Sequence, residues 1–456
     1  MTPRPRLSKG SARVATAPDA GFRRELGLLD AVVVVAGGII GVGIFANPSN
    51  VARVLHSPLL ILLAWGTGGG VALLGGFIWA ELGSRLPHVG GQYVYLARAY
   101  PPIIGFLYGV ALLFIINGGS LAAVAILFAT YVDRSFVPLG PAGVRAVAAG
   151  ALITLTLVNI AGVRAGKRTN NTLMAAKVGG ILVLLALVFT HGAGPASHIA
   201  LGDAAAPSAG SFPLLFTALV PILFAYGGWQ SCGSLAAEVT EPARNLARAN
   251  VIGVIVVISL YLSLNIAYLW AFTPLEMAAS PALAADVAAR VAGDAGARFV
   301  ALLVVISSLG FLGVVIITGP RLYYAMARDG LFFARAGRLH PRYHTPVFAL
   351  WFQAGVSLVL LTTNTYDELL SYTVFADWLF FGLTAGALFI LRRRQPAPSG
   401  IFRAPGHPFT TGIFVLVAFG IVTNSFFAFP VQSLIGSGIL LLAAGGFTML
   451  RTRAAR

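Results

Sequence analysis

Long apolar stretches recur along the whole chain and alternate with short polar segments. Most of them reach the ~20 residues that an α-helix needs to cross the ~30 Å hydrocarbon core of a bilayer. The pattern therefore predicts an all-α integral membrane protein with about twelve transmembrane helices in one membrane domain. The predicted spans are 27–54, 58–82, 103–132, 143–163, 171–190, 212–236, 249–272, 298–320, 346–363, 369–391, 409–429 and 432–450.

The composition agrees with this pattern, because 57% of the 456 residues are hydrophobic and only 10% are charged, which excludes a soluble globular protein. The net charge of +16 reflects membrane topology rather than a nucleic-acid partner. When the spans are counted from a cytoplasmic N-terminus, 25 of the 31 Lys and Arg residues lie on the cytoplasmic side. This positive-inside bias predicts a multi-pass protein of the cytoplasmic (inner) membrane with both termini in the cytoplasm.

The first predicted span contains a glycine-rich interruption, because residues 36–45 read AGGIIGVGIF. A helix in lipid gains nothing from four glycines in this stretch, so the pattern predicts a break that exposes backbone groups to a ligand. The helix half that begins after the break would point free NH groups at the ligand, and such a helix start favours a carboxylate. The predicted donors are the backbone NH groups of Gly41, Val42, Gly43 and Ile44.

A second interruption lies in the sixth predicted span, where residues 224–233 read FAYGGWQSCG. The helix halves that end at the two breaks expose carbonyl oxygens, which suit an ammonium group. The predicted amine acceptors are the backbone carbonyl groups of Ile39, Ile40, Phe224, Ala225 and Gly227. An anion site beside a cation site describes the zwitterion of an α-amino acid. The alternative is that the glycines only allow close packing between helices.

The two breaks occupy matching places in two blocks of five spans, since Gly41 and Gly227 are 186 residues apart. Glycine-interrupted segments at corresponding positions of two halves are typical of transporters built from inverted repeats. The outer segment 273–297 is expected to be a connector. The predicted division is a cytoplasmic tail (1–26), a first repeat (27–191), a second repeat (212–391), two additional spans (409–450) and a second cytoplasmic tail (451–456).

Several polar or aromatic residues inside the spans are candidates for function. Lys177 in the fifth span costs about 2.5–3.5 kcal/mol to insert, so it needs a partner or a task, unless its side chain snorkels toward the interface. Asn117 in the third span could reach the substrate or bond a neighbouring helix. Tyr226 and Trp229 are candidates for closing over the substrate. Asp377 in the tenth span could line the path or make a contact at a helix end.

Three other residues suggest structural roles. Glu81 and Glu238 close the second and sixth spans near arginines, which predicts contacts at a cytoplasmic gate or at helix ends. Cys232 is the only cysteine, so the chain cannot form an intramolecular disulfide or a metal site made of thiolates. The sequence shows no metal-ligand cluster, nucleophile triad or convergent carboxylate pair, so we expect neither an enzyme nor a cofactor.

Several of these motifs, taken in order, resemble the amino acid-polyamine-organocation superfamily, and most of all its L-type amino acid transporter branch. The resemblance covers most of the chain and is clearest over the first eight spans. It rests on Leu29-Asp30 leading into GGIIGVGIF, on WAELGSRLP at 79–87 followed by GGQYVY at 90–95, on FAYGGWQ at 224–230, and on Glu238 followed by EPARNL at 241–246.

The resemblance implies a LeuT-like fold of five plus five spans in inverted repeats, with two additional helices. It also implies that the GxG backbone binds the substrate carboxylate and that carbonyl groups of the sixth span bind its amine. A lysine in the fifth span of the family matches Lys177, and its charge stands where sodium-coupled relatives keep an ion, which implies sodium-independent transport. Val42 departs from the small or hydroxyl residue that is common there, which adds bulk next to the carboxylate site. No cysteine lies in the loop after the third span, so we expect no disulfide-linked heavy chain.

The sequence thus predicts a secondary transporter that moves amino acids across the membrane by alternating access, as an exchanger or a proton-coupled symporter. Neutral L-α-amino acids are the expected substrates, because the breaks themselves offer no carboxylate for a cationic side chain. Two alternatives remain open. One is an antiporter of polyamines or other organic amines, and the other is an amino acid sensor that transports nothing.

Overall fold

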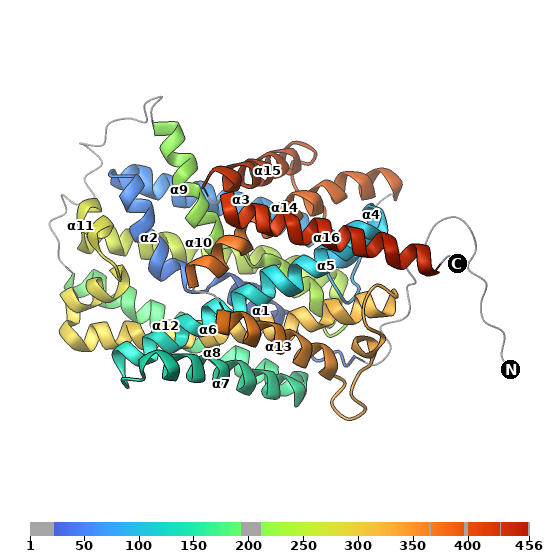
Figure 1. Ribbon diagram of the computed structural model, residues 1–456. Helices are drawn as coiled ribbons and strands as arrows, with labels where there is room; N and C mark the ends of the chain where they lie inside the picture. The colour runs from blue at the N-terminus through green and yellow to red at the C-terminus, as the bar shows by residue number, and fades with distance from the viewer. Residues whose placement is uncertain (1–21, 193–210, 364–365, 396–399, 429, 455–456) are drawn as a thin grey trace.

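The computed structural model describes residues 22–192, 211–363, 366–395, 400–428 and 430–454, and in this part of the chain the regular elements are helices (Figure 1). Helices satisfy their own backbone hydrogen bonds, which a bilayer core demands. The helices are α1 (Leu28–Ile39), α2 (Gly43–Val54), α3 (Pro58–Arg85), α4 (Gln92–Ala99), α5 (Pro102–Ala111), the π-helix η1 (Leu112–Ile116), α6 (Asn117–Ser135), α7 (Gly140–Ile160), α8 (Val163–His191), α9 (Ser211–Tyr226), the 3₁₀-helix η4 (Trp229–Leu235), α10 (Pro242–Ala271), α11 (Pro274–Ala279), α12 (Leu283–Arg328), η5 (Ala334–Gly337), α13 (Val347–Thr363), α14 (Tyr366–Arg394), α15 (Phe409–Ala428) and α16 (Pro430–Ala454).

The helices account for the predicted spans. Within the described residues, ten helices are long and apolar enough to cross a membrane, and the bent pair of α1 and α2 makes an eleventh. The remaining predicted span, 346–363, is α13, a shorter apolar helix. The all-α, multi-pass membrane architecture expected from the sequence is therefore confirmed.

The helices pack in pairs that relate the first five spans to the next five. The pairs α3–α10, α6–α12 and α7–α13 each join spans five places apart. Other contacts come in matching pairs. The contact α1–α10, between the first and seventh spans, corresponds to α3–α9, between the second and sixth. The contact α8–α12, between the fifth and eighth spans, corresponds to α6–α14, between the third and tenth. These contacts are those that two five-span repeats would produce, although the repeat boundaries remain a prediction.

Three segments differ from their predicted form. The expected connector 273–297 contains α11 and the start of α12, which kinks at Gly293, where φ is +61°. Helix α11 packs on α2 at the end of the bundle opposite α4 (Figure 1). The described part of the predicted tail, residues 22–26, is attached to the bundle, because Leu26 pairs with Val239 in a parallel bridge. At the other terminus, α16 continues to Ala454 through most of the second predicted tail.

Candidate functional site

The first predicted interruption is present between α1 and α2. Helix α1 ends at Ile39 and α2 begins at Gly43, and the two axes differ in direction by 41°. The NH group of Gly41 turns back to the carbonyl of Ile39 at 2.8 Å. The NH groups of Val42 and Gly43 have no acceptor among the described residues, and α2 has no side-chain cap. The break therefore leaves helix-start donors available, as a bound anion requires.

The second interruption is present at Gly227 and Gly228, between α9 and the 3₁₀-helix η4. The two breaks touch each other through backbone. Gly228 has φ +132°, and a Cβ there would lie 2.3 Å from the carbonyl oxygen of Gly38. A Cβ on Gly43 would lie 3.0 Å from that of Ala225. Glycine is required at position 228 by both its conformation and its contact, so the sequence brings the two open helix ends together.

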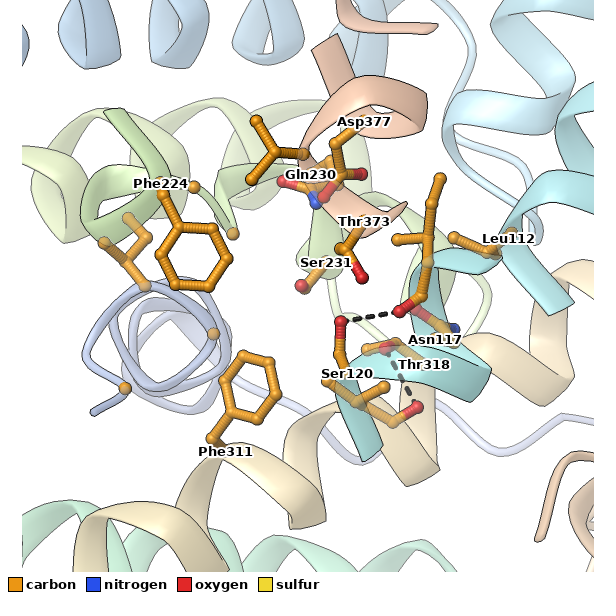
Figure 2. Close-up of a pocket in the computed structure, with 18 of the residues that line it drawn as sticks. Leu112, Asn117, Ser120, Phe224, Gln230, Ser231, Phe311, Thr318, Thr373 and Asp377 are labelled. Carbon is orange, nitrogen blue, oxygen red and sulfur yellow. Dashed lines mark hydrogen bonds between the residues drawn. The ribbon is translucent and has the colours of Figure 1, made fainter. Parts of the chain in front are cut away.

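A cavity of about 110 Å³ lies beside the breaks. This is several times the roughly 10–15 Å³ that a single water molecule needs, so the cavity has room for a small solute. Figure 2 shows Phe224 and Phe311 facing this space together with the polar residues Ser120, Ser231 and Thr373. The site is thus enclosed by aromatic rings and hydroxyl groups, with exposed backbone at the breaks.

The predicted carboxylate donors are only partly placed as expected. Gly41, Val42 and Gly43 line the cavity. Ile44 is fully buried and does not line it, so its role as a donor stays a prediction. The NH group of Gly41 is already bonded to Ile39. Val42 and Gly43 therefore remain as the free donors.

The predicted amine acceptors need a similar correction. Ile40 does not line the cavity, and its carbonyl accepts a hydrogen bond from the ammonium group of Lys177. The carbonyl of Ile39 already accepts two bonds, from Gly41 NH and from the hydroxyl of Tyr261 at 3.0 Å. The carbonyl of Ile40 is therefore bonded and outside the cavity lining, and that of Ile39 has both lone pairs engaged while Tyr261 donates to it, so neither is available to a substrate amine in this conformation.

The carbonyls at the second break keep acceptor capacity. Phe224, Ala225 and Gly227 line the cavity. The carbonyl of Phe224 accepts one bond from Gly227 NH. The hydroxyl of Tyr261 lies 3.2 Å from the carbonyl oxygen of Ala225, but its single proton can serve only one of Ala225 and Ile39 at a time. Each retains a lone pair, and no described residue donates to the carbonyl of Gly227. These three residues are the remaining candidates for the amine.

Lys177 lies behind the first break and does not line the cavity. It is 1% exposed and donates to the carbonyl of Ile40, so the snorkelling alternative is wrong. No described carboxylate forms an ion pair with it. The hydroxyl of Ser307 on α12 donates to the carbonyl of Gly41 at 3.1 Å. Helices α8 and α12 thus both donate hydrogen bonds to the unwound residues of the first break.

Two predicted gate residues lie elsewhere. Tyr226 packs against Trp65 and Tyr261, and Trp229 packs in an aromatic cluster that includes Trp79. Both are fully buried and neither lines the cavity. Their role in closing over the substrate therefore stays a prediction. Phe224 and Phe311 face the cavity instead (Figure 2), and Tyr108, Trp378 and Phe381 also line it.

Asn117 lines the cavity as predicted, and so does Asp377. Asn117 is also within 3.5 Å of Gln353, which makes it an interhelical contact as well. Sequence reasoning missed Ser120, Thr318 and Thr373, although a signal exists. On each of three spans the lining residues recur every fourth position, which is one face of a helix: Tyr108, Leu112, Ile116, Ser120 and Val124; Phe311, Val315 and Gly319; and Thr373, Asp377 and Phe381.

The two predicted gate carboxylates are fully buried and paired. Glu238 forms an ion pair with Arg321 of α12 at 2.8 Å. Glu81 contacts Arg85 at 2.8 Å and Arg392 at 2.5 Å, and it also accepts the NH of Ala404. Both pairs lie outside the cavity lining, and Glu81 and Arg392 are near the ends of α3 and α14. They connect distant segments, so they suit a contact that forms in one conformation and breaks in another.

A multi-pass helical bundle with two broken helices around a central cavity defines an integral membrane transporter. The family model described as amino acid permease matches residues 26–449, and the chain belongs to this family. It is therefore an amino acid transporter and not an enzyme.

Three relatives illustrate the similarity. The chain is 32% identical over 376 residues to the b(0,+)-type amino acid transporter 1 of Mus musculus, which covers 81% of this chain and 76% of the relative. It is 30% identical over 410 residues to the large neutral amino acids transporter small subunit 2 of Rattus norvegicus, and the match covers 87% of this chain and 74% of the relative. It is 29% identical over 415 residues to the serine/threonine exchanger SteT of Bacillus subtilis (strain 168), and the match covers 89% of this chain and 93% of the relative.

Proposed function

We propose that this permease moves α-amino acids across the cytoplasmic membrane by alternating access and binds the substrate zwitterion between its two broken helices. The carboxylate would accept from the NH groups of Val42 and Gly43, and the amine would donate to the carbonyls of Phe224, Ala225 and Gly227. The observation that carries the proposal is the pair of free NH groups at the start of α2, which face the same cavity as free carbonyl lone pairs.

The backbone site accounts for the common part of every α-amino acid and leaves the side chain to the rest of the cavity. Neutral side chains are the class that the aromatic residues Phe224 and Phe311 would accept without further chemistry. The side chain of Val42 lines the cavity too and reduces the space next to the carboxylate. Substrates of modest size fit this arrangement best.

Transport would proceed by movement of α1 and η4 as one unit. The NH groups of Glu25 and Leu26, just before α1, donate to the carbonyl of Glu238 just after η4, both at 2.9 Å. The NH of Thr240 donates back to Leu26 at 2.9 Å. These bonds join the two moving segments, while the Glu238–Arg321 pair connects them to α12 in the present conformation. States that differ by a few kcal/mol would let substrate binding shift the population.

Lys177 is the proposed coupling residue. Its ammonium group bonds a carbonyl of the first break from behind the site, so a change in its charge would be felt at the break. A fixed or protonated cation at this place supports sodium-independent operation, as an exchanger or as a proton-coupled symporter. We further propose that both termini are cytoplasmic, that residues 27–191 and 212–391 form the two repeats, and that no disulfide-linked heavy chain is needed.

An organic-amine antiporter is the second candidate, because the cavity wall contains the acidic residue Asp377. Uptake of radiolabelled amino acids into proteoliposomes tests the first proposal, with competition by amines that lack a carboxylate. The proposed function predicts uptake or exchange of at least one α-amino acid and weak competition by the matching amine. Folded protein that exchanges the amine as well as the amino acid would favour the antiporter.

A further inference from the structure

The cavity contains a carboxylate that the proposed zwitterion site does not use. Asp377 lies one helical turn from both Thr373 and Phe381 on α14, and all three line the cavity. Figure 2 shows Asp377 and Thr373 on the ribbon of α14 beside the space that Ser120 and Ser231 face. The acid therefore belongs to the wall that would surround a substrate side chain.

No described basic residue balances this acid within the cavity. None of the described lining residues is Lys, Arg or His. Lys177 and Arg321 are both fully buried, but Lys177 donates to the carbonyl of Ile40, and Arg321 is paired with Glu238. No described residue donates a hydrogen bond to Asp377 or forms an ion pair with it. An ionisable side chain at this depth is costly and usually marks a path for a substrate or an ion.

A second acceptor lies on the same cavity. Gln230 of η4 lines it, and its Oε1 atom is buried without a hydrogen-bond partner among the described residues. Two acceptors near aromatic faces call for a group that is rich in donors and positively charged. An ammonium group has three donors and a guanidinium group has five, and either can also lie against Phe224 or Phe311 in a cation–π contact.

We propose that the cavity also accepts amino acids whose side chain ends in an ammonium or guanidinium group, with Asp377 as the counter-charge and Gln230 as an additional acceptor. This inference rests on the proposed function, because the α-carboxylate and α-amine of such a substrate still occupy the two breaks. Charge balance supports it, since a cationic side chain neutralises Asp377 where the dielectric constant is low. An acidic side chain would add a second negative charge, so acidic amino acids are excluded.

The test compares lysine, leucine, glutamate and cadaverine, which is lysine without its carboxylate. Each is measured as radiolabelled uptake into proteoliposomes that contain the wild-type protein, Asp377→Asn or Asp377→Glu. We expect the wild type to take up lysine and leucine but not glutamate. Asp377→Asn should lower lysine uptake by roughly 10- to 150-fold, the value of one charge-assisted hydrogen bond, and lower leucine uptake far less. Asp377→Glu keeps the charge and should retain more lysine uptake than the Asn variant.

The possible failures are distinguishable. Wild-type uptake of leucine without lysine would overturn the inference and leave the proposed function intact. An equal loss of leucine and lysine uptake in a folded Asp377→Asn protein would also overturn it, because the acid would then serve all substrates. Uptake of cadaverine as fast as that of lysine, or no amino acid uptake at all, would instead overturn the proposed function. Size-exclusion profiles and melting temperatures establish that each variant is folded.

Discussion

Adding one methyl group at Gly41 separates a binding role of the first break from a structural one. The backbone at position 41 does not need glycine in this conformation, since φ of Gly41 is outside the left-handed region. A Cβ on Gly41 would meet nothing closer than Phe311 at 3.6 Å. That is an ordinary van der Waals distance, and Gly41 lines the cavity. The methyl group of Gly41→Ala would therefore enter the space beside the free NH groups and leave the fold undisturbed.

The expected effects on stability and on binding have opposite signs. Gly→Ala at a compatible position stabilises a protein by about 0.4–1 kcal/mol, so the melting temperature should be unchanged or higher. The methyl group would hold the substrate carboxylate away from the NH groups of Val42 and Gly43. Loss of one charge-assisted hydrogen bond costs about 1.5–3 kcal/mol, which weakens binding roughly 10- to 150-fold.

The assay is equilibrium binding of the preferred radiolabelled amino acid to purified protein, together with thermal melting. Gly179→Ala on α8 is the matched control, because a Cβ there meets nothing within 4 Å, so its Kd should be unchanged and its stability unchanged or higher. Gly228→Ala is the structural contrast and should fold poorly, since its Cβ would overlap the backbone of Gly38. Unchanged Kd in Gly41→Ala would refute the carboxylate site, and a lower melting temperature would refute the claim that glycine is dispensable for folding.

Three further predictions concern residues around the site. Lys177→Met should leave the melting temperature unchanged or raised, because it removes a buried charge without an ionic partner. The transport rate in proteoliposomes should fall sharply, and a variant that transports at the full rate would exclude a coupling role for Lys177. Glu238→Gln leaves Arg321 buried and unpaired, so it should lower the free energy of unfolding by about 3–5 kcal/mol in chemical or thermal unfolding. The control Glu276→Gln, in an exposed pair, should change the free energy of unfolding by about 0–1 kcal/mol. Burial raises the pKa of Asp329, so the protonated carboxyl favours the folded state. The melting temperature should therefore fall as pH rises from about 4 through the raised pKa. Asp329→Asn should lack this fall in a pH series of melting temperatures, and the same dependence of melting temperature on pH in the variant would contradict the prediction.

The two breaks could be predicted from the sequence because their signal is local. Glycines at 37, 38, 41 and 43 inside an apolar span have no value for an unbroken helix, and the same holds for the pair Gly227-Gly228. The structure interrupts the helices at these places. The number of spans could also be predicted from the sequence, because the length and apolarity of each span are properties of a continuous stretch of residues.

The state of each backbone group could not be predicted, because it depends on residues far away in the chain. The carbonyl of Ile39 is occupied by Tyr261, 222 residues later, and that of Ile40 by Lys177, 137 residues later. The direction in which the side chain of Trp229 points could not be predicted for a related reason. A short 3₁₀ segment follows the break, so the side chains after Gly228 do not continue the face of α9.

The lining of the cavity was missed because hydroxyl residues are common in membrane helices. Thr318 bonds the carbonyl of its own helix at Val314, which is an ordinary arrangement there. Only the repetition of lining positions every fourth residue, on three spans at once, distinguishes this face from the others. Those spans meet through packing between α6, α12 and α14, which no single stretch of sequence reveals.

An experimental structure of the protein with a bound amino acid tests the central claim most directly. We expect the substrate carboxylate to lie within hydrogen-bond distance of the NH groups of Val42 and Gly43, and its amine against the carbonyls of Phe224, Ala225 or Gly227. A substrate bound in the reverse orientation, or bound away from both breaks, would contradict the account.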